Sequence, residues 1–270
     1  MKKFLSLLGI ITILTILTAC GGGNAEGDAL SEDELTVGVT AGPHEQIMEK
    51  VAELAEEEGL TINVEVFQEY VMPNTALEEG ELDANSYQHK PFLDDFIEDR
   101  GYNLVDVATT VNFPMGIYST AISDVSELEE GDSVGLPNDP TNGARALILF
   151  EDAGLITLDE EAGTSATVLD IVENPLDLNF VELEASQIPR QLDELAAATI
   201  NTNFAIEHGY VPTQDSIFIE PSDSPWVNLL VVREENQDDP VVQQLIDLYQ
   251  SEEIQQFVDE TFEGSVVTSW

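Results

Sequence analysis

From residue 35 onward, the hydrophobic positions of the chain alternate between a strand-like period of two and a helix-like period of about 3.6. Leu35–Thr40 and Thr61–Phe67 are rich in β-branched residues, and every second residue of the latter run is apolar. Between them, Glu45–Glu58 carries apolar residues at helical spacing, and Gly59 ends the pattern. This first stretch predicts a strand, a helix and a second strand.

The alternation continues to the C-terminus. It predicts further strands over 104–109, 115–121, 133–136, 178–183, 217–219 and 227–232. It predicts further helices over 73–79, 91–100, 142–153, 186–198, 201–208, 240–250 and 252–262. Strands separated by helices form βαβ units, so we expect an α/β protein with mainly parallel sheets flanked by helices.

The N-terminus has the features of a targeting segment. Lys2 and Lys3 precede an apolar run, Phe4–Ala19, which is shorter than the roughly 20 residues of a transmembrane helix. It is typical of the hydrophobic region of a secretory signal. The run ends in Leu17–Cys20, which resembles a bacterial lipobox, the motif in which the cysteine is lipidated. We therefore expect residues 1–19 to be a lipoprotein signal peptide and Cys20 to carry the lipid.

The segment 20–34 begins with glycines after Cys20 and continues with polar residues, as expected of a flexible tether. The predicted location is extracytoplasmic, with the chain anchored to the membrane by its lipid. Two alternatives remain at this point: a secretory signal with a chance cysteine, or a short membrane anchor.

Charge excludes several classes of function. The chain has 54 acidic residues against 8 Lys and Arg, a formal net charge of −46. A nucleic-acid-binding protein or one that docks on anionic lipid needs a basic face, which so few cations cannot form. A large acidic excess favours solubility, but its self-repulsion destabilises the folded state in low salt. We therefore expect a protein of a saline or alkaline environment.

Catalytic and metal-binding signals are weak. The single cysteine excludes disulfides, and only His44, His89 and His208 could serve as imidazole ligands. No G-x-S-x-G, H-E-x-x-H or EF-hand loop occurs, and acidic pairs such as Asp94 and Asp95 arise by chance in so acidic a chain. We expect no enzyme, no metal and no cofactor.

A lipid-tethered α/β protein of this length is typical of extracytoplasmic solute-binding proteins, in which two lobes close on a ligand by hinge motion. Long segments spread along the chain resemble the methionine-binding lipoproteins of ABC transporters, the MetQ/NlpA family. They are Gly80–Phe92, Asn112–Tyr118, Pro137–Ala146, Asp215–Glu220 and Ser224–Glu234, and the C-terminal Trp270 fits the same family.

The resemblance implies a two-lobed periplasmic-binding-protein-like fold with the ligand cleft between the lobes. We expect lobe one to comprise 35–118 and 227–270, and lobe two 119–226, with crossovers near 118–121 and 225–228. It also implies a monomeric receptor that captures methionine, L and also D, and delivers it to a permease with a cytoplasmic ATPase.

A free amino acid needs a cation for its carboxylate and acceptors for its ammonium group. Arg145 follows a turn at a helix start, and its planar fork suits a carboxylate. The resemblance assigns it that role; the alternative is a salt bridge to one of the many acids. The resemblance also places Asn228, within an apolar strand, and Asn203 against the ligand. A structural amide at Asn228, or a helix cap at Asn201 or Asn203, is the alternative.

The slot for the ligand side chain should be aromatic, because thioethers pack well on rings. The candidates are Phe67, Tyr70, Tyr87, His89 and Phe113. Phenylalanine is commoner in the family at the place of Tyr87, which leaves strict methionine specificity open. The same fold could bind another apolar amino acid or a methionine-containing dipeptide, or the chain could be a surface interaction or adhesion lipoprotein.

Overall fold

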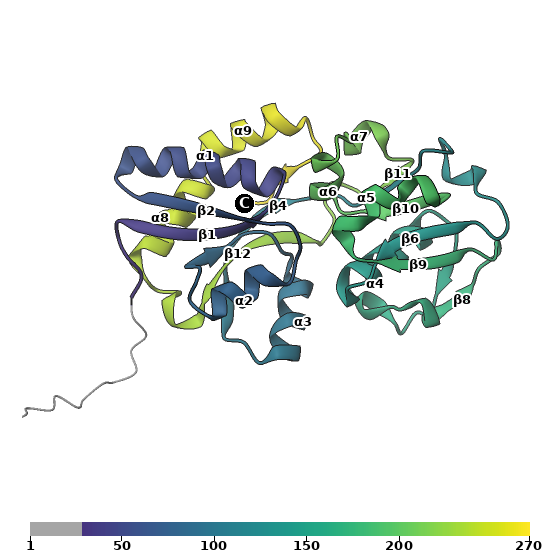
Figure 1. Cartoon of the computed structure of the whole chain (residues 1–270), viewed down its shortest axis with the longest axis horizontal. Helices are drawn as coiled ribbons and strands as arrows, with labels where there is room; N and C mark the ends of the chain where they lie inside the picture. The colour runs from purple at the N-terminus through teal and green to yellow at the C-terminus, as the bar shows by residue number, and fades with distance from the viewer. Residues whose placement is uncertain (1–28) are drawn as a thin grey trace, which may run out of the picture.

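The computed structural model describes residues 29–270, which form an α/β protein of two lobes arranged side by side (Figure 1). The predicted signal peptide, Cys20 and the first part of the predicted tether lie outside the described residues. Lobe one is built on a six-stranded sheet of order β13-β4-β12-β3-β1-β2. Its strands are β1 (Glu34–Thr40), β2 (Thr61–Phe67), β3 (Ala84–Asn85), β4 (Leu104–Asn112), β12 (Val227–Arg233) and β13 (Val267–Thr268).

Helices cover both faces of the sheet of lobe one (Figure 1). They are α1 (Pro43–Glu58), α2 (Met72–Glu78), α3 (Lys90–Arg100), α8 (Pro240–Tyr249) and α9 (Glu252–Phe262). Strand β12 shows why two hydrophobic cores form. Leu230 and Val232 belong to the core with α1, α8 and α9, whereas Leu229 and Val231 belong to the core with α2. A strand that is buried on both faces is continuously apolar, as this one is from Leu229 to Val232.

Lobe two is built on a five-stranded sheet of order β11-β5-β10-β6-β9. Its strands are β5 (Gly116–Tyr118), β6 (Ser133–Pro137), β9 (Asn179–Leu183), β10 (Ala197–Ile200) and β11 (Phe218–Ile219), with a separate hairpin of β7 (Thr157–Leu158) and β8 (Ile171–Glu173). Its α-helices are α4 (Pro140–Asp152), α5 (Ile188–Gln191), α6 (Thr202–Glu207) and α7 (Pro212–Asp215). The buried face of α4 forms the centre of this lobe's main core.

Both sheets are mixed rather than mainly parallel in their pairing, which corrects the expectation from the sequence. In lobe one, β1 pairs in parallel with β2 and β3, but β12 is antiparallel to β3 and β4. In lobe two, β5 is antiparallel to β10 and β11. The physical reason is the chain crossing. Strands β5 and β12 enter directly from the other lobe, with no helix to carry the chain back to the start of the sheet.

The first crossing lies at residues 113–115, earlier than the expected 118–121. Strand β5 pairs with β10 in lobe two, so the chain has already left lobe one at Asn112. Pro114 lies in this crossing and has no N–H with which to continue a ladder. The return crossing lies between Ile219, the end of β11, and Val227, the start of β12. The expected crossing, 225–228, overlaps the end of this segment.

The segment 186–198, expected to be one helix, is broken into short pieces. It contains the 3₁₀ turns η4 (Ala185–Gln187) and η5 (Leu192–Glu194) around α5, and then the strand β10. Strand β10 is fully buried between β5 and β6, so its place in the sheet overrides the helical preference of its alanines. Within residues 29–270, no helix is long and apolar enough to cross a membrane.

Candidate functional site

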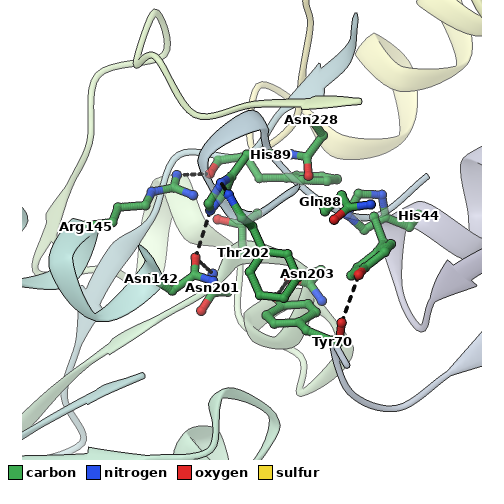
Figure 2. A pocket seen from close by; sticks show the side chains of 13 residues that line it. His44, Tyr70, Gln88, His89, Asn142, Arg145, Asn201, Thr202, Asn203 and Asn228 are labelled. Atoms are coloured by element: carbon green, nitrogen blue, oxygen red, sulfur yellow. Dashed lines mark hydrogen bonds between the residues drawn. The ribbon is translucent and has the colours of Figure 1, made fainter. Parts of the chain in front are cut away.

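A cavity lies where the two lobes meet, with about 360 Å³ of space that atoms do not fill, part of it open to solvent (Figure 2). Most of its wall comes from residues that follow the carboxyl ends of strands, the edge at which open α/β sheets bind ligands. The lining residues are His44, Tyr70, Tyr87, Gln88, His89, Phe92, Phe113, Asn142, Arg145, Asn201, Thr202, Asn203 and Asn228.

Arg145 is the only charged side chain of this wall and is 3% exposed. It projects from the first part of α4, which Asp139 caps by accepting a hydrogen bond from the Asn142 N–H at 2.9 Å. The guanidinium makes a two-pronged ion pair with buried Glu220: Nε to Oε1 at 2.8 Å and Nη2 to Oε2 at 2.5 Å. Nη2 also donates to the carbonyl of Phe113 at 2.7 Å. Arg145 therefore lines the cavity and also forms a salt bridge, the alternative that the sequence left open; its contact with a ligand carboxylate stays a prediction.

The pairing leaves one end of the guanidinium available. No hydrogen bond from Nη1 of Arg145 to any residue in 29–270 is present, and Figure 2 shows the guanidinium reaching from α4 towards the middle of the pocket. Glu220 balances the charge of Arg145, so this buried pair carries no net charge. Such a site favours a ligand with no net charge, such as a zwitterion.

His89 joins the two lobes through its imidazole. Its Nδ1 accepts the Phe92 N–H at 3.2 Å, so Nε2 carries the proton and donates to Oδ1 of Asn142, also at 3.2 Å. Burial, together with the nearby positive charge of Arg145, lowers the pKa of His89 to about 3. The ring is thus neutral and fixed in one orientation.

Four asparagines line the cavity, and the side-chain oxygen of one of them, Asn142, is engaged by His89 and Asn201. The side chain of Asn201 stands at the first position before α6 but does not cap it; its Nδ2 donates instead to Oδ1 of Asn142 at 2.8 Å. Oδ1 of Asn201 is buried without a hydrogen-bond partner in the described part of the chain. Asn142 is itself held by Asp139, whose pKa burial raises. Asn201 therefore offers an unpaired acceptor.

Asn228 lies in β12, which runs antiparallel to its neighbours β3 and β4. Its backbone forms an isolated antiparallel β-bridge with that of His89. Its Nδ2 donates to the carbonyl of Val111 at 3.2 Å, and its Oδ1 accepts no hydrogen bond from residues 29–270. The Oδ1 of Asn203, by contrast, accepts the hydroxyl of Tyr70 at 2.7 Å, a second hydrogen bond between the lobes. Asn228 and Asn201 are thus better placed than Asn203 to accept from a ligand.

The aromatic part of the wall comes mainly from lobe one. The rings of Tyr70 and Tyr87 lie 6.1 Å apart, and Tyr70 also contacts Phe92 and Phe204. The hydroxyl of Tyr87 donates to the backbone carbonyl of Tyr70 at 2.9 Å. Burial raises the pKa of both tyrosines, so both stay protonated. The hydroxyl of Tyr87, which a phenylalanine would lack, thus stabilises the loop after β2 by this hydrogen bond.

All the predicted ligand-contacting residues except Phe67 line the cavity. Phe67 ends β2 and packs instead with Leu77 and Leu82 in the core beneath α2. Several lining residues were not predicted from the sequence, namely His44, Gln88, Phe92, Asn142, Asn201 and Thr202. A signal existed for Asn142, which lies three residues before Arg145 in the same helix and so shares its face. Nothing in the sequence pattern marked His44.

The sequence and the fold are both similar to those of known proteins. Residues 35–270 match the NlpA lipoprotein family. The chain is 43% identical to the D-methionine-binding lipoprotein MetQ of Salmonella typhimurium, over 99% of both sequences. Its fold is similar to that of a nutrient-binding protein from Burkholderia cenocepacia bound to methionine, with a TM-score of 0.86 and 43% identity over 87% of this chain and 100% of the other. It is also similar to a solved methionine-binding protein, MetQ, with a TM-score of 0.87 and 44% identity over 89% and 99% of the two chains.

Proposed function

The chain belongs to the NlpA lipoprotein family, and we propose that it is the extracytoplasmic substrate-binding subunit of an ABC importer for methionine. In this proposal, the cavity between the lobes holds one methionine. Relatives named as methionine-binding lipoproteins, and a similar structure bound to methionine, support the substrate.

The observation that carries the proposal is that a buried arginine and unpaired amide oxygens line the same cavity between the lobes. Arg145 supplies Nη1 for the carboxylate of the amino acid. Oδ1 of Asn228 and Oδ1 of Asn201 supply acceptors for the ammonium group. A ligand that contacts residues of both lobes stabilises the closed arrangement over the open one.

The remaining wall suits a thioether. Tyr70, Tyr87, Phe92 and Phe113 offer ring surfaces, against which each sulfur contact contributes roughly 0.3–1.5 kcal/mol. Since the hydroxyl of Tyr87 donates its proton to the Tyr70 carbonyl, it presents no free donor to the ligand side chain. The departure of Tyr87 from the phenylalanine of the family therefore leaves the apolar slot intact.

The proposal extends to the partners and location of the receptor. Residues 1–19 are removed as a signal peptide, Cys20 carries the lipid, and the segment up to residue 34 tethers the binding domain to the membrane. The loaded monomer then delivers methionine to a permease that a cytoplasmic ATPase drives. Its surface charge fits a saline or alkaline medium outside the cell.

The test is calorimetric titration of the soluble domain, refolded without ligand in high salt, with L-methionine, D-methionine, leucine and glutamine. We expect tight one-to-one binding of L-methionine and weak or no binding of glutamine. Tighter binding of another amino acid would retain the fold and replace the substrate. No binding by a protein with native circular dichroism would contradict the receptor function and favour a surface-interaction role.

A further inference from the structure

We propose that His44 recognises the sulfur atom of the ligand, by donating an imidazole N–H to the thioether. This inference rests on the proposed function, because it concerns the side-chain end of the same cavity. It assigns methionine selectivity to a polar contact in addition to the aromatic packing.

His44 is the most unusual polar group in the cavity wall. It is 2% exposed, yet its Nδ1 has no hydrogen-bond partner, and no hydrogen bond to Nε2 from any residue in 29–270 is present. Its ring packs edge-to-face against the ring of Phe113 at a centroid distance of 4.5 Å. The other histidine of the wall, His89, has both nitrogens engaged. A buried donor without a partner is costly, so a ligand that supplies an acceptor gains affinity.

The position of His44 fits the far end of a bound amino acid. It lies in the first turn of α1 in lobe one, and in Figure 2 it stands on the opposite side of the pocket from Arg145 of lobe two. With the carboxylate at Arg145, the side chain of the amino acid extends across the cavity towards His44 and Phe113. The only heteroatom in a methionine side chain is its sulfur.

At neutral pH, His44 is uncharged and can donate one N–H to a weak acceptor such as a thioether sulfur. Burial lowers its pKa to about 3, so at neutral pH the ring is uncharged and has one N–H donor and one acceptor nitrogen. A thioether sulfur is a weak hydrogen-bond acceptor, whereas a methylene group at the same place is none. The imidazole therefore distinguishes methionine from an aliphatic side chain of equal length.

The experiment compares L-methionine with L-norleucine, in which a methylene group replaces the sulfur, by calorimetric titration of the wild-type domain and two variants. We expect the wild type to prefer methionine by about five- to tenfold. His44→Phe keeps a flat ring against Phe113 but has no N–H, so the preference should fall to about twofold or less, mainly through weaker methionine binding. His44→Gln retains an N–H donor and should keep most of the preference.

His208→Phe serves as the matched control, because it replaces a histidine outside the cavity. A preference unchanged in His44→Phe would overturn the inference while leaving the receptor function intact. Failure of the wild type to bind either amino acid would contradict the proposed function instead. A second measurement needs no variant: in ¹⁵N-histidine-labelled wild type, the imidazole signals of His44 should shift on adding methionine and much less on adding norleucine. Equal shifts with both amino acids would also overturn the inference.

Discussion

At the scale of single residues, the neutral pair of Arg145 and Glu220 decides what the cavity selects. An unpaired buried arginine would attract any anion, but the two-pronged contact with Glu220 leaves one guanidinium nitrogen and no net charge. The site then discriminates by the geometry of its acceptors, Oδ1 of Asn228 and Oδ1 of Asn201. In the proposed function, a chain of net charge −46 thus needs no basic cleft to bind the carboxylate of an amino acid.

The role of Tyr87 gives a prediction at this scale. Tyr87→Phe removes the hydrogen bond to the Tyr70 carbonyl, so the free energy of unfolding should fall by about 0.5–1.5 kcal/mol. Methionine affinity should change less than about twofold, because the hydroxyl does not face the ligand. Urea unfolding and calorimetric titration measure the two quantities. A large loss of affinity in a stable variant would mean that the hydroxyl contacts the ligand.

His44 predicts a pH dependence of stability. Its pKa is about 3 in the folded protein against 6.5 normally, so unfolding takes up a proton below pH 6.5. The free energy of unfolding is therefore not reduced by His44 above about pH 6.5, and it falls as the pH drops from 6.5 towards 3. Between pH 6.5 and pH 5, the wild type should lose about 2 kcal/mol more than His44→Phe. Parallel stability curves in urea at the two pH values would contradict this.

Residue chemistry was predictable from the sequence where it was local. The position of Arg145 after a turn, and the polar Asn228 inside an apolar strand, marked both as candidates; the resemblance to the family placed them at the ligand, and both line the cavity. His44 and Asn201 were not predictable as pocket residues, because what distinguishes them is a missing hydrogen-bond partner. Only the folded chain shows that Nδ1 of the one and Oδ1 of the other are buried without partners.

At the scale of elements, helices and strands with a strong period were predicted closely. The predicted strand Thr61–Phe67 and helix 252–262 have the bounds found in β2 and α9. The segment 186–198 was wrong in part because β10 takes its conformation from its neighbours β5 and β6, not from its alanines. The antiparallel direction of β12 could not be predicted from the sequence either, because its pairing with β3 and β4 depends on the crossing from lobe two.

The start of helix α4 offers a prediction at the element scale. Asp139→Ala removes the cap and the support of the Asn142 side chain, so the free energy of unfolding should fall by about 0.5–2 kcal/mol. Methionine affinity should fall too, because Asn142 holds both His89 and Asn201. Asp139→Asn, which keeps an acceptor for the cap, is the matched control and should lose less of both. Equal losses in the two variants would contradict the capping role.

At the scale of the whole molecule, the acidic surface outweighs its few ion pairs. The surface pairs of Lys50 with Glu53 and of Lys90 with Asp94 are exposed, and such pairs contribute only about 0–1 kcal/mol each. Self-repulsion among the remaining acids is therefore screened chiefly by dissolved salt. The screening length falls from about 30 Å at 0.01 M salt to about 3 Å at 1 M.

We accordingly expect the free energy of unfolding in urea to rise steadily as sodium chloride is raised from dilute buffer to the molar range. The rise should level off once the screening length is shorter than the spacing of the surface acids. Urea is used because guanidinium chloride is itself a salt. A urea midpoint that does not change with salt would contradict the predicted adaptation to a saline medium.

In the proposed function, one amino acid lies between the lobes, with its carboxylate on Arg145 and its ammonium group on Asn228. The most direct test is methionine titration of the wild type, of Asn228→Ala, and of the double variant Arg145→Met with Glu220→Gln, which removes both buried charges together. Glu220→Gln alone is the control for the lost acid. We predict tight binding by the wild type and loss of at least about a hundredfold in affinity, roughly 2.7 kcal/mol, in Asn228→Ala and in the double variant. Wild-type affinity in either folded variant would contradict the account.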